Sequence, residues 1–188
     1  MLTNMNDCTS QVLRPPARVQ ESSLETSALP RRLIEIDIPG FKQIAVDHLV
    51  LDFNGTLAVD GVLRPGVVER LEELSRHVQI DVVTADTFGT AASQLAGLPV
   101  NLVVLGEESQ AKAKRMAVLR YGSDSVIAIG NGRNDQQMLA AAVIGILVIQ
   151  KEGAAGAALA SADIVVTSIL EALDLLLHPR RLVATLRA

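Results

Sequence analysis

Four short segments of this chain carry side chains that could act together in phosphoryl transfer. They are 52–57 (DFNGTL), 84–89 (TADTFG), 112–114 (KAK) and 130–139 (GNGRNDQQML). Asp52 supplies a carboxylate that could attack phosphorus and carry the phosphoryl group covalently. The Thr84 hydroxyl and the backbone N–H groups after Asp52 could hold phosphoryl oxygens, and a lysine could pair with Asp52 and the phosphoryl charge.

A divalent cation would complete this chemistry by neutralising the non-bridging oxygens of the phosphoryl group. Asp52, a backbone carbonyl and a later carboxylate would provide hard oxygen ligands, which suit Mg²⁺. Each segment alone has a plainer structural interpretation: Asn and Gly are typical of turns, and a lysine on a helix usually faces solvent. Their occurrence together, in this order, favours the chemical interpretation.

The elements that must position these residues alternate between strands and helices. Apolar runs predict strands at 33–38, 48–53, 78–83, 102–105, 126–129, 144–149 and 163–166. Helical patterns fall at 67–74, 90–98, 109–121, 135–142, 153–160 and 168–177. Ser168 can cap the last of these helices and Pro179 ends it, and 181–187 could add one or two turns. The alternation predicts an α/β fold, a three-layer Rossmann-like parallel sheet with helices on both faces. Ligands of such sheets bind beyond the carboxyl ends of the strands, which is where three of the four segments lie.

The composition of the 188 residues excludes several classes of protein. Hydrophobic residues make up 49% and aromatic residues only 2%, so a nucleic-acid module built on aromatic stacking is excluded. The net charge of −4 argues against binding of a nucleic-acid backbone, and no nucleic-acid partner is expected. The single cysteine, Cys8, excludes a disulfide framework and a cysteine-based zinc site.

The chain is expected to be a single domain at 33–188 that follows a disordered leader at 1–32. The leader is rich in polar residues and proline and lacks sustained apolar periodicity, although a start site placed too far upstream is an alternative. The longest apolar run, 139–149, is too short to span a bilayer, and no secretory signal is visible. The expected location is therefore the cytoplasm, with no membrane partner.

Together the four segments resemble the motifs of the haloacid dehalogenase superfamily of aspartate-nucleophile phosphotransferases. The nearest resemblance is to small soluble relatives of the phosphorylation domain of P-type ATPases, and it covers about residues 33–188. Segment 51–57 resembles the Asp-Lys-Thr-Gly-Thr loop of those ATPases, and Thr84 matches the second motif. Segment 130–135 resembles their Gly-Asp-Gly-x-Asn-Asp loop.

The resemblance implies an HAD-like fold and a role for each matching residue. Catalytic roles fall to Asp52, Asn54, Thr84 and Lys114, with Lys112 as the alternative lysine. Phosphate contacts fall to Phe53, Gly55, Thr84, Ala85 and Lys114. The Mg²⁺ ligands would be Asp52, the Asn54 carbonyl, the Asn131 side chain and Asp135, the last directly or through water.

Two residues depart from the family pattern. Superfamily phosphatases usually have an acid–base aspartate two residues after the nucleophile, whereas this chain has Asn54, which has no proton to transfer near neutral pH. Asn131 stands where P-type ATPases have a metal-binding aspartate, and the loss of a carboxylate weakens the hold on the ion. These departures predict slow turnover or a restriction to good leaving groups.

The chain is also short for this superfamily. Only 58–64 separate the nucleophile loop from the first helix, and 88–112 leave no room for a large insertion, so no cap domain is expected. An open site suits a bulky or macromolecular phosphorylated substrate, or closure by a second subunit in a homo-oligomer. Two alternatives to the hydrolase remain: a phosphoryl-binding regulator without turnover, and a different reaction at Asp52, such as dehalogenation.

Overall fold

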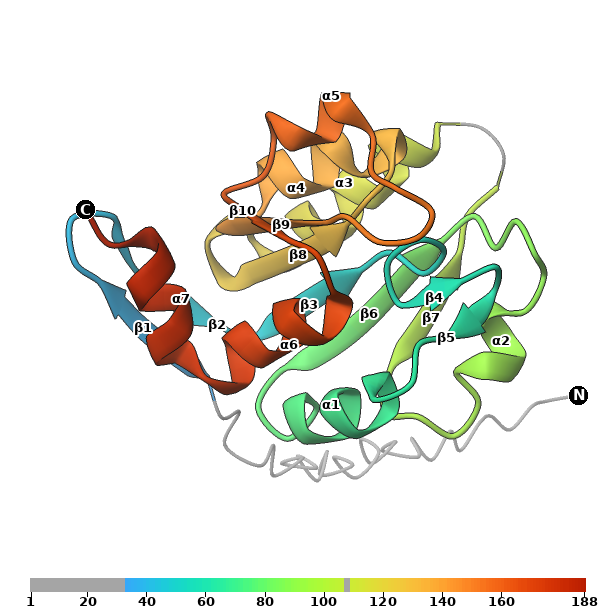
Figure 1. The fold of residues 1–188 in the computed structure, drawn as a ribbon, viewed down its shortest axis with the longest axis horizontal. Coiled ribbons are helices and arrows are strands. Elements are labelled where there is room, and N and C mark those ends of the chain that lie inside the picture. The colour runs from blue at the N-terminus through green and yellow to red at the C-terminus, as the bar shows by residue number, and fades with distance from the viewer. Residues whose placement is uncertain (1–32, 107–108) are drawn as a thin grey trace, which may run out of the picture.

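The structure, a computed structural model, describes residues 33–106 and 109–188. Its centre is a six-stranded parallel sheet with the strand order β10-β9-β8-β3-β6-β7 (Figure 1). The strands are β3 (His48–Leu51), β6 (Gln79–Thr84), β7 (Asn101–Val104), β8 (Val126–Gly130), β9 (Ile144–Val148) and β10 (Ile164–Val166). The predicted parallel α/β sheet is confirmed. The predicted leader at 1–32 lies outside the described residues.

Helices cover both faces of this sheet, as the alternating pattern predicts (Figure 1). One face carries α1 (Val67–Leu74), α2 (Ala91–Gln94) and α6 (Ile169–Leu177), and the other carries α3 (Gln110–Tyr121), α4 (Gln136–Ala141) and α5 (Gly156–Leu159). Two 3₁₀ turns, η1 (Ser123–Ser125) and η2 (Arg133–Asp135), flank β8. The fold is the predicted three-layer Rossmann-like arrangement.

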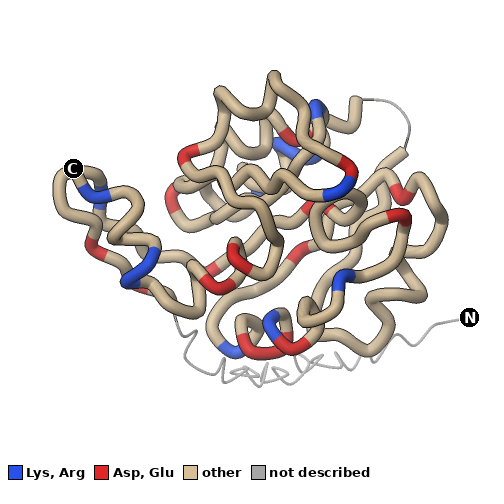
Figure 2. The backbone as a smooth tube through the Cα atoms, viewed as in Figure 1, with Lys and Arg blue, Asp and Glu red and all other residues tan. Residues whose placement is uncertain are grey.

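Successive residues of the central strands point to opposite faces of the sheet, so they belong to two separate hydrophobic clusters, one on each face. All of β3 is buried: Leu49 and Leu51 pack toward α1 and α6, whereas Val50 packs toward α3 and α4. Continuous apolar runs therefore form the strands, because a strand covered on both faces needs apolar side chains on both. On the first face, Arg70 of α1 forms a two-point ion pair with Asp174 of α6, at 2.7 and 3.1 Å. Figure 2 shows acidic and basic residues interspersed along these helices.

A hairpin at the start of the described chain differs from the prediction. The predicted strand at 33–38 is confirmed as β1 (Ile34–Ile38), whose isoleucines are buried and whose polar residues are exposed. It pairs antiparallel with β2 (Lys42–Val46), which the sequence pattern did not indicate. Helix α7 (Pro179–Leu186) packs against β1, so Pro179 begins a helix directly after α6 instead of only ending one.

Two predicted helices are shorter than expected, and one predicted cap is confirmed. The helices expected at 90–98 and 153–160 reduce to α2 and α5, of four residues each. Gly97 and Gly153 adopt positive φ angles of 80° and 74°, which no α-helix contains. Ser168 caps α6 as expected, since its Oγ accepts a hydrogen bond from the Leu170 N–H at 3.2 Å.

No cap domain covers the carboxyl ends of the strands in the described part of the chain. Between β3 and α1 lies only a small hairpin, β4 (Ala58–Val59) and β5 (Val62–Leu63). Asp60 and Gly61 at its tip both have positive φ, as a tight two-residue hairpin turn requires. No helix among the described residues has both the length and the hydropathy needed to cross a bilayer.

Candidate active site

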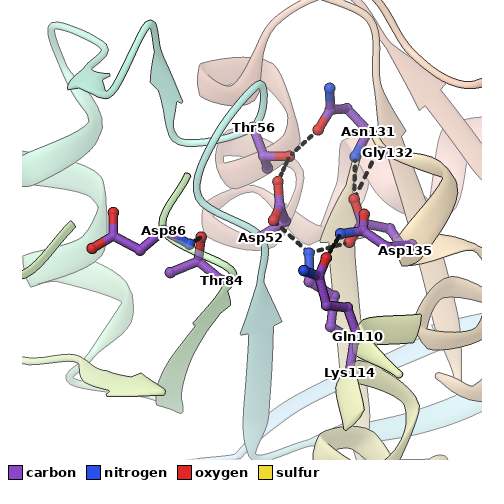
Figure 3. A network of polar contacts seen from close by, with 10 residues as sticks. Asp52, Thr56, Thr84, Asp86, Gln110, Lys114, Asn131, Gly132 and Asp135 are labelled. Atoms are coloured by element: carbon purple, nitrogen blue, oxygen red, sulfur yellow. Dashed lines mark hydrogen bonds and ion pairs between the residues drawn. The ribbon is translucent and has the colours of Figure 1, made fainter. Parts of the chain in front are cut away.

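The candidate site lies where three neighbouring strands end. Asp52 follows β3, Thr84 ends β6 and Asn131 follows β8, and the strand order places β3 between the other two. Figure 3 shows Asp52 between Thr84 on one side and Lys114 with Asp135 on the other. A cavity of about 170 Å³ opens here, lined by Asp52, Asn54, Thr84, Ala85, Thr87, Gln110, Asn131, Gly132 and Asn134.

A buried lysine joins the two aspartates of the site. Lys114, on α3, has no exposed surface, and its Nζ lies 2.5 Å from Asp52 Oδ1 and 2.6 Å from Asp135 Oδ1. The alternative lysine, Lys112, is exposed on the same helix. The geometry therefore brings Lys114 and not Lys112 to Asp52.

The charges of these three buried groups shift one another's pKa values. The pKa of Asp52 is raised from 3.8 to about 7, because burial and, to a smaller extent, the nearby charge of Asp135 raise it more than Lys114 lowers it. Burial alone would lower the pKa of Lys114, but the two carboxylates outweigh it, and the pKa is raised. Lys114 is therefore a fixed positive charge near neutral pH.

Asp135 organises the loop after β8. Its Oδ2 accepts hydrogen bonds from the backbone N–H groups of Asn131, at 2.9 Å, and Gly132, at 2.7 Å, while Oδ1 meets Lys114. A Cβ atom at Gly130 would lie only 2.6 Å from this carboxylate. The Asp135 carboxylate thus fixes the position of the Lys114 ammonium group relative to the backbone of the loop after β8.

Asn131 turns its amide oxygen toward the nucleophile loop. Its Nδ2 donates to the Gly153 carbonyl at 3.0 Å, which leaves Oδ1 facing Thr56 Oγ1 at 3.2 Å. The same threonine hydroxyl lies 3.1 Å from Asp52 Oδ2. Gly55 approaches this amide so closely that a Cβ would lie 2.2 Å from Nδ2, and its φ of 79° also favours glycine.

The backbone of the nucleophile loop offers two N–H groups to a ligand. Gly55 N–H donates to Ala58 at 2.8 Å and Thr56 N–H donates to Phe53 at 3.3 Å, so both are used within the loop. The N–H groups of Phe53 and Asn54 make no hydrogen bond to another described residue. The Phe53 side chain is part of the core, which leaves only its backbone for phosphate contact.

Thr84 and Asp86 have different surroundings. The Thr84 hydroxyl accepts a hydrogen bond from the Asp86 N–H at 2.9 Å, so its own proton remains available to a ligand in the cavity. Asp86 Oδ1 accepts from the N–H groups of Thr90 and Ala91, both at 3.0 Å, and so caps α2. Asp86 does this in a left-handed conformation, with φ of 48°.

Asn54 lines the cavity and carries an oxygen with no hydrogen-bond partner among the described residues. That atom is its side-chain Oδ1, which is buried. Buried polar atoms are normally satisfied, so this oxygen indicates a place for a ligand atom or a water. The predicted neighbours Asp52, Thr84, Ala85 and Asn131 line the same cavity.

Several residues of the site were not assigned a role from the sequence, although Thr87 and Asn134 lie within two of the four segments. Thr87, Gln110 and Asn134 line the cavity, and Asn134 Nδ2 donates to Gln110 Oε1 at 3.0 Å. Gln150, after β9, donates to the carbonyls of Gly55 and Thr56 and accepts from the Ile169 N–H. Glutamines and asparagines of this kind are common in loops, and only the fold shows that they meet here.

Several solved structures have an architecture similar to that of this chain. A cobalt-bound deoxy-D-mannose-octulosonate 8-phosphate phosphatase of Haemophilus influenzae superposes with a TM-score of 0.60 at 17% identity, over 72% of this chain and 90% of that one. A haloacid dehalogenase-like hydrolase of Streptococcus pneumoniae gives 0.54 at 14% identity, over 69% and 97%. These likenesses show that the chain has the fold of these hydrolases. A third similar structure is the 3-deoxy-D-manno-octulosonate 8-phosphate phosphatase of Moraxella catarrhalis, solved with magnesium and phosphate ions, at a TM-score of 0.55 and 15% identity over 74% and 92%.

Sequence comparison finds two kinds of relative, a small archaeal protein and part of a plant ATPase. The chain belongs with the Methanocaldococcus jannaschii protein MJ0073, which is 48% identical over 84 residues, or 44% of this chain and 90% of that protein. HMA5 of Arabidopsis thaliana, whose name describes a probable copper-transporting ATPase, is 30% identical over 95 residues, or 50% of this chain and 10% of the ATPase. No family model matches the chain.

Proposed function

We propose that the chain is a phosphohydrolase that forms a phosphoryl-enzyme on Asp52. The contact that carries this proposal is the buried Asp52–Lys114 pair at the wall of a small polar cavity, with Thr84 on the other side. Two of the structural relatives are phosphatases by name, which agrees with this use of the fold. The cavity volume of about 170 Å³ suits the phosphoryl group and the first atoms of its substituent.

In the first step a carboxylate oxygen of Asp52 attacks phosphorus, and the bond from phosphorus to the leaving-group oxygen breaks. Lys114 holds Oδ1 and balances charge, whereas Oδ2 accepts only the hydrogen bond from Thr56 and keeps a lone pair. The Thr84 hydroxyl and the N–H groups of Phe53 and Asn54 are the donors for the phosphoryl oxygens. Attack of water on the aspartyl phosphate then releases inorganic phosphate and restores the carboxylate.

Asn54 determines which leaving groups this site can release. An amide can donate a hydrogen bond but cannot transfer a proton to a departing alkoxide. Some leaving groups are stable as anions and need no such proton. Examples are the carboxylate released from an acyl phosphate and the phenolate released from an aryl phosphate. We therefore expect fast turnover only of substrates with these groups, and a longer-lived aspartyl phosphate.

The donor atoms around Asp52 fit a magnesium ion. The Asp52 carboxylate, the Asn54 carbonyl and the Asn131 amide oxygen are hard oxygen ligands, and all three residues line the same cavity. Asp135 uses both oxygens for Lys114 and the loop N–H groups, which favours contact with the ion through water. When bound, the ion would neutralise the non-bridging phosphoryl oxygens.

The alternative function is a phosphoryl-binding regulator. It is favoured by the amides at Asn54 and Asn131, which remove a proton donor and a ligand charge from the site. In either function the small β4–β5 hairpin leaves room for a bulky phosphorylated partner, or for a second subunit that closes the site.

The decisive experiment is a phosphate-release assay with acetyl phosphate and p-nitrophenyl phosphate, with Mg²⁺ or with EDTA. We expect turnover with Mg²⁺ only, no turnover in Asp52→Asn, and a covalent phosphate on wild-type protein that hydroxylamine removes. Lys114→Ala should be inactive, and the exposed Lys112→Ala is its matched control. Binding of phosphate without turnover would support the regulator. Turnover that survives Asp52→Asn would overturn the mechanism.

A further inference from the structure

A second hollow lies at the β7 edge of the sheet, and we call it the edge cavity. Its volume is about 500 Å³, which lies in the range of small-molecule sites. Its apolar walls come from Val83 of β6, Val103 and Leu105 at β7, and Ala113, Met116 and Ala117 of α3. None of these residues lines the cavity at Asp52.

The sheet edge explains why this hollow exists. β7 is the last strand of the sheet, whereas α3 contacts the central strands β3 and β8. Val103 keeps 40% of its surface exposed and Met116 keeps 51%, so the apolar walls are open to solvent. Apolar walls gathered in a hollow, with a few polar groups at one end, are typical of small-molecule sites.

A carboxylate closes one end of the edge cavity. Asp81 lies two residues before Val83 on β6, so both side chains point toward α3, and only 4% of Asp81 is exposed. Its Oδ1 accepts a hydrogen bond from Asn101 Nδ2 at 3.0 Å. Its Oδ2 is buried and has no hydrogen bond to a described residue. A buried carboxylate oxygen with no donor is costly, which makes it a strong acceptor for a ligand that supplies one.

The other polar groups at this end do not neutralise Asp81. Arg120 lines the cavity, but no ion pair joins it to Asp81 in the described structure. The Tyr121 phenol also lies here; burial raises its pKa, and a hydrogen bond to Asp81 and the charge of Asp81 raise it further. Tyr121 and Asn101 are neutral donors, so neither supplies Asp81 with a positive charge. A protonated amine is therefore the ligand group that best complements this end, because it brings the opposite charge and a further donor.

We propose that the edge cavity binds a small organic amine, with its ammonium group on Asp81 and its apolar body against β7 and α3. The site does not depend on the phosphohydrolase function and would exist in a catalytically inactive protein. Its two walls belong to elements that also serve the Asp52 site: Ala113 precedes Lys114 on α3, and Val83 precedes Thr84 on β6. A bound amine would thus contact the two elements that carry the lysine and the threonine.

Titration calorimetry with phenethylamine tests the proposal, with 2-phenylethanol and phenylacetate as probes of similar shape and different charge. We expect phenethylamine alone to bind at submillimolar concentration, and Asp81→Asn to weaken it at least tenfold. Asp37→Asn, which removes an exposed carboxylate on β1, is the matched control and should change nothing. Ala117→Leu should weaken binding by filling the cavity.

Hydrogen exchange locates the probe independently of affinity. Bound phenethylamine should protect 101–105 and 113–121 and leave the nucleophile loop at 52–57 unchanged. The proposal is wrong if phenylethanol binds as well as the amine, if Asp81→Asn folds and keeps full affinity, or if none of the probes binds at millimolar concentration. A concentration-dependent dimer protected at β7 would instead show that a second copy covers this edge.

Discussion

The ammonium group of Lys114 lies 2.5 Å from a carboxylate oxygen of Asp52, and both side chains are buried. The pair is not isolated, because the same ammonium group lies 2.6 Å from Asp135. One buried positive charge therefore faces two buried negative ones. This imbalance determines how the stability of the protein without metal responds to mutation and to pH.

Replacement of Lys114 by methionine should destabilise the protein strongly at neutral pH. The variant leaves Asp52 and Asp135 buried together without a cation, and the loss of one partner of a buried pair costs about 3–5 kcal/mol. The loss should shrink in acid, where the carboxylates become protonated. Urea unfolding in EDTA, with the exposed Lys112→Met as control, measures the difference. Equal stability of the two variants at neutral pH would contradict the buried trio.

Asp52→Asn should have the opposite effect on stability while abolishing turnover. Because the folded pKa of Asp52 is raised from 3.8 to about 7, the folded state binds more protons than the unfolded state between these values. The contribution of Asp52 to the free energy of unfolding therefore falls as pH rises through this window. The variant should lack this fall and melt higher than wild type above about pH 7, by ~2–4 °C per kcal/mol.

Melting curves of wild type and Asp52→Asn in EDTA at several pH values test whether the variant is the more stable protein above about pH 7. The two proteins should converge toward acid pH, where Asp52 is protonated and resembles the amide. Magnesium should reduce the difference, because the ion favours the ionised carboxylate. A wild-type protein that is more stable than Asp52→Asn at high pH without metal would show that Lys114 outweighs burial.

The sheet could be predicted from the sequence because its strands are buried on both faces. Their continuous Val, Ile and Leu runs leave little ambiguity, and the residues after β3, β6 and β8 meet at one edge because parallel strands end together. The β1–β2 hairpin was only half predicted, since KQIAV in β2 alternates weakly and depends on α7 and β1 for burial. Short helices were overestimated where glycines with positive φ interrupt them.

The residues that follow the strands could be predicted from the sequence, but the residue that holds the nucleophile loop in position, Gln150, could not. Asp52, Thr84 and Asn131 have positions that strand ends explain. Lys114 was preferred to Lys112 on a weak spacing pattern, and the fold supports that choice because Lys114 is the buried one. Gln150 lies 94 and 95 residues from the carbonyls it contacts. A contact of this range between common residue types leaves no local pattern.

Gln150 should be a positioning residue for the nucleophile loop. Its side chain donates to the carbonyls of Gly55, at 3.2 Å, and Thr56, at 2.8 Å, and accepts from Ile169 at 3.0 Å, so it ties the loop to α6. Gln150→Ala should lose about 1–3 kcal/mol of stability, because three polar groups lose their partner. It should also weaken phosphate binding more than it weakens magnesium binding.

A comparison of variants separates positioning from stability alone. Gln150→Asn is one methylene too short to span both segments and should behave like the alanine variant. Gln137→Ala, on the exposed side of α4, should match wild type in both affinities. If Gln150→Ala lowers the melting temperature but leaves the affinity for orthophosphate unchanged, its role is structural only.

Beryllium fluoride should bind the wild-type protein in the presence of magnesium. This anion mimics a phosphoryl group on a carboxylate, and binding to the folded state alone stabilises by ~2.7 kcal/mol at a hundredfold excess over Kd. The melting temperature should therefore rise more with Mg²⁺ and beryllium fluoride together than with Mg²⁺ alone, and beryllium fluoride alone should leave it unchanged. Asp52→Asn should abolish the rise. An unchanged melting curve in every condition would favour a protein that does not form the phosphoryl-enzyme.

Asn54→Asp should change the range of leaving groups that the site accepts. Asn54 lines the cavity and its unpaired oxygen is buried, so the new carboxyl would stand beside Asp52 in a place that can reach a substrate. A proton donor raises hydrolysis of alkyl phosphates, whose alkoxides need protonation, more than that of aryl or acyl phosphates. We expect a gain of ~10-fold or more on alkyl phosphates, below the ~10²–10⁴ of an evolved acid, because its surroundings were not selected to tune the new pKa.

The matched measurement is kcat/KM for glycerol phosphate and p-nitrophenyl phosphate in wild type and Asn54→Asp, at saturating Mg²⁺. The ratio of the two values should move toward the alkyl substrate, and it is insensitive to the fraction of folded protein. Asn134→Asp adds the same charge to the cavity wall at another position and should leave the ratio unchanged. An equal change for both substrates in Asn54→Asp would show that residue 54 does not contact the leaving group, because a general electrostatic effect on Asp52 acts on both substrates alike.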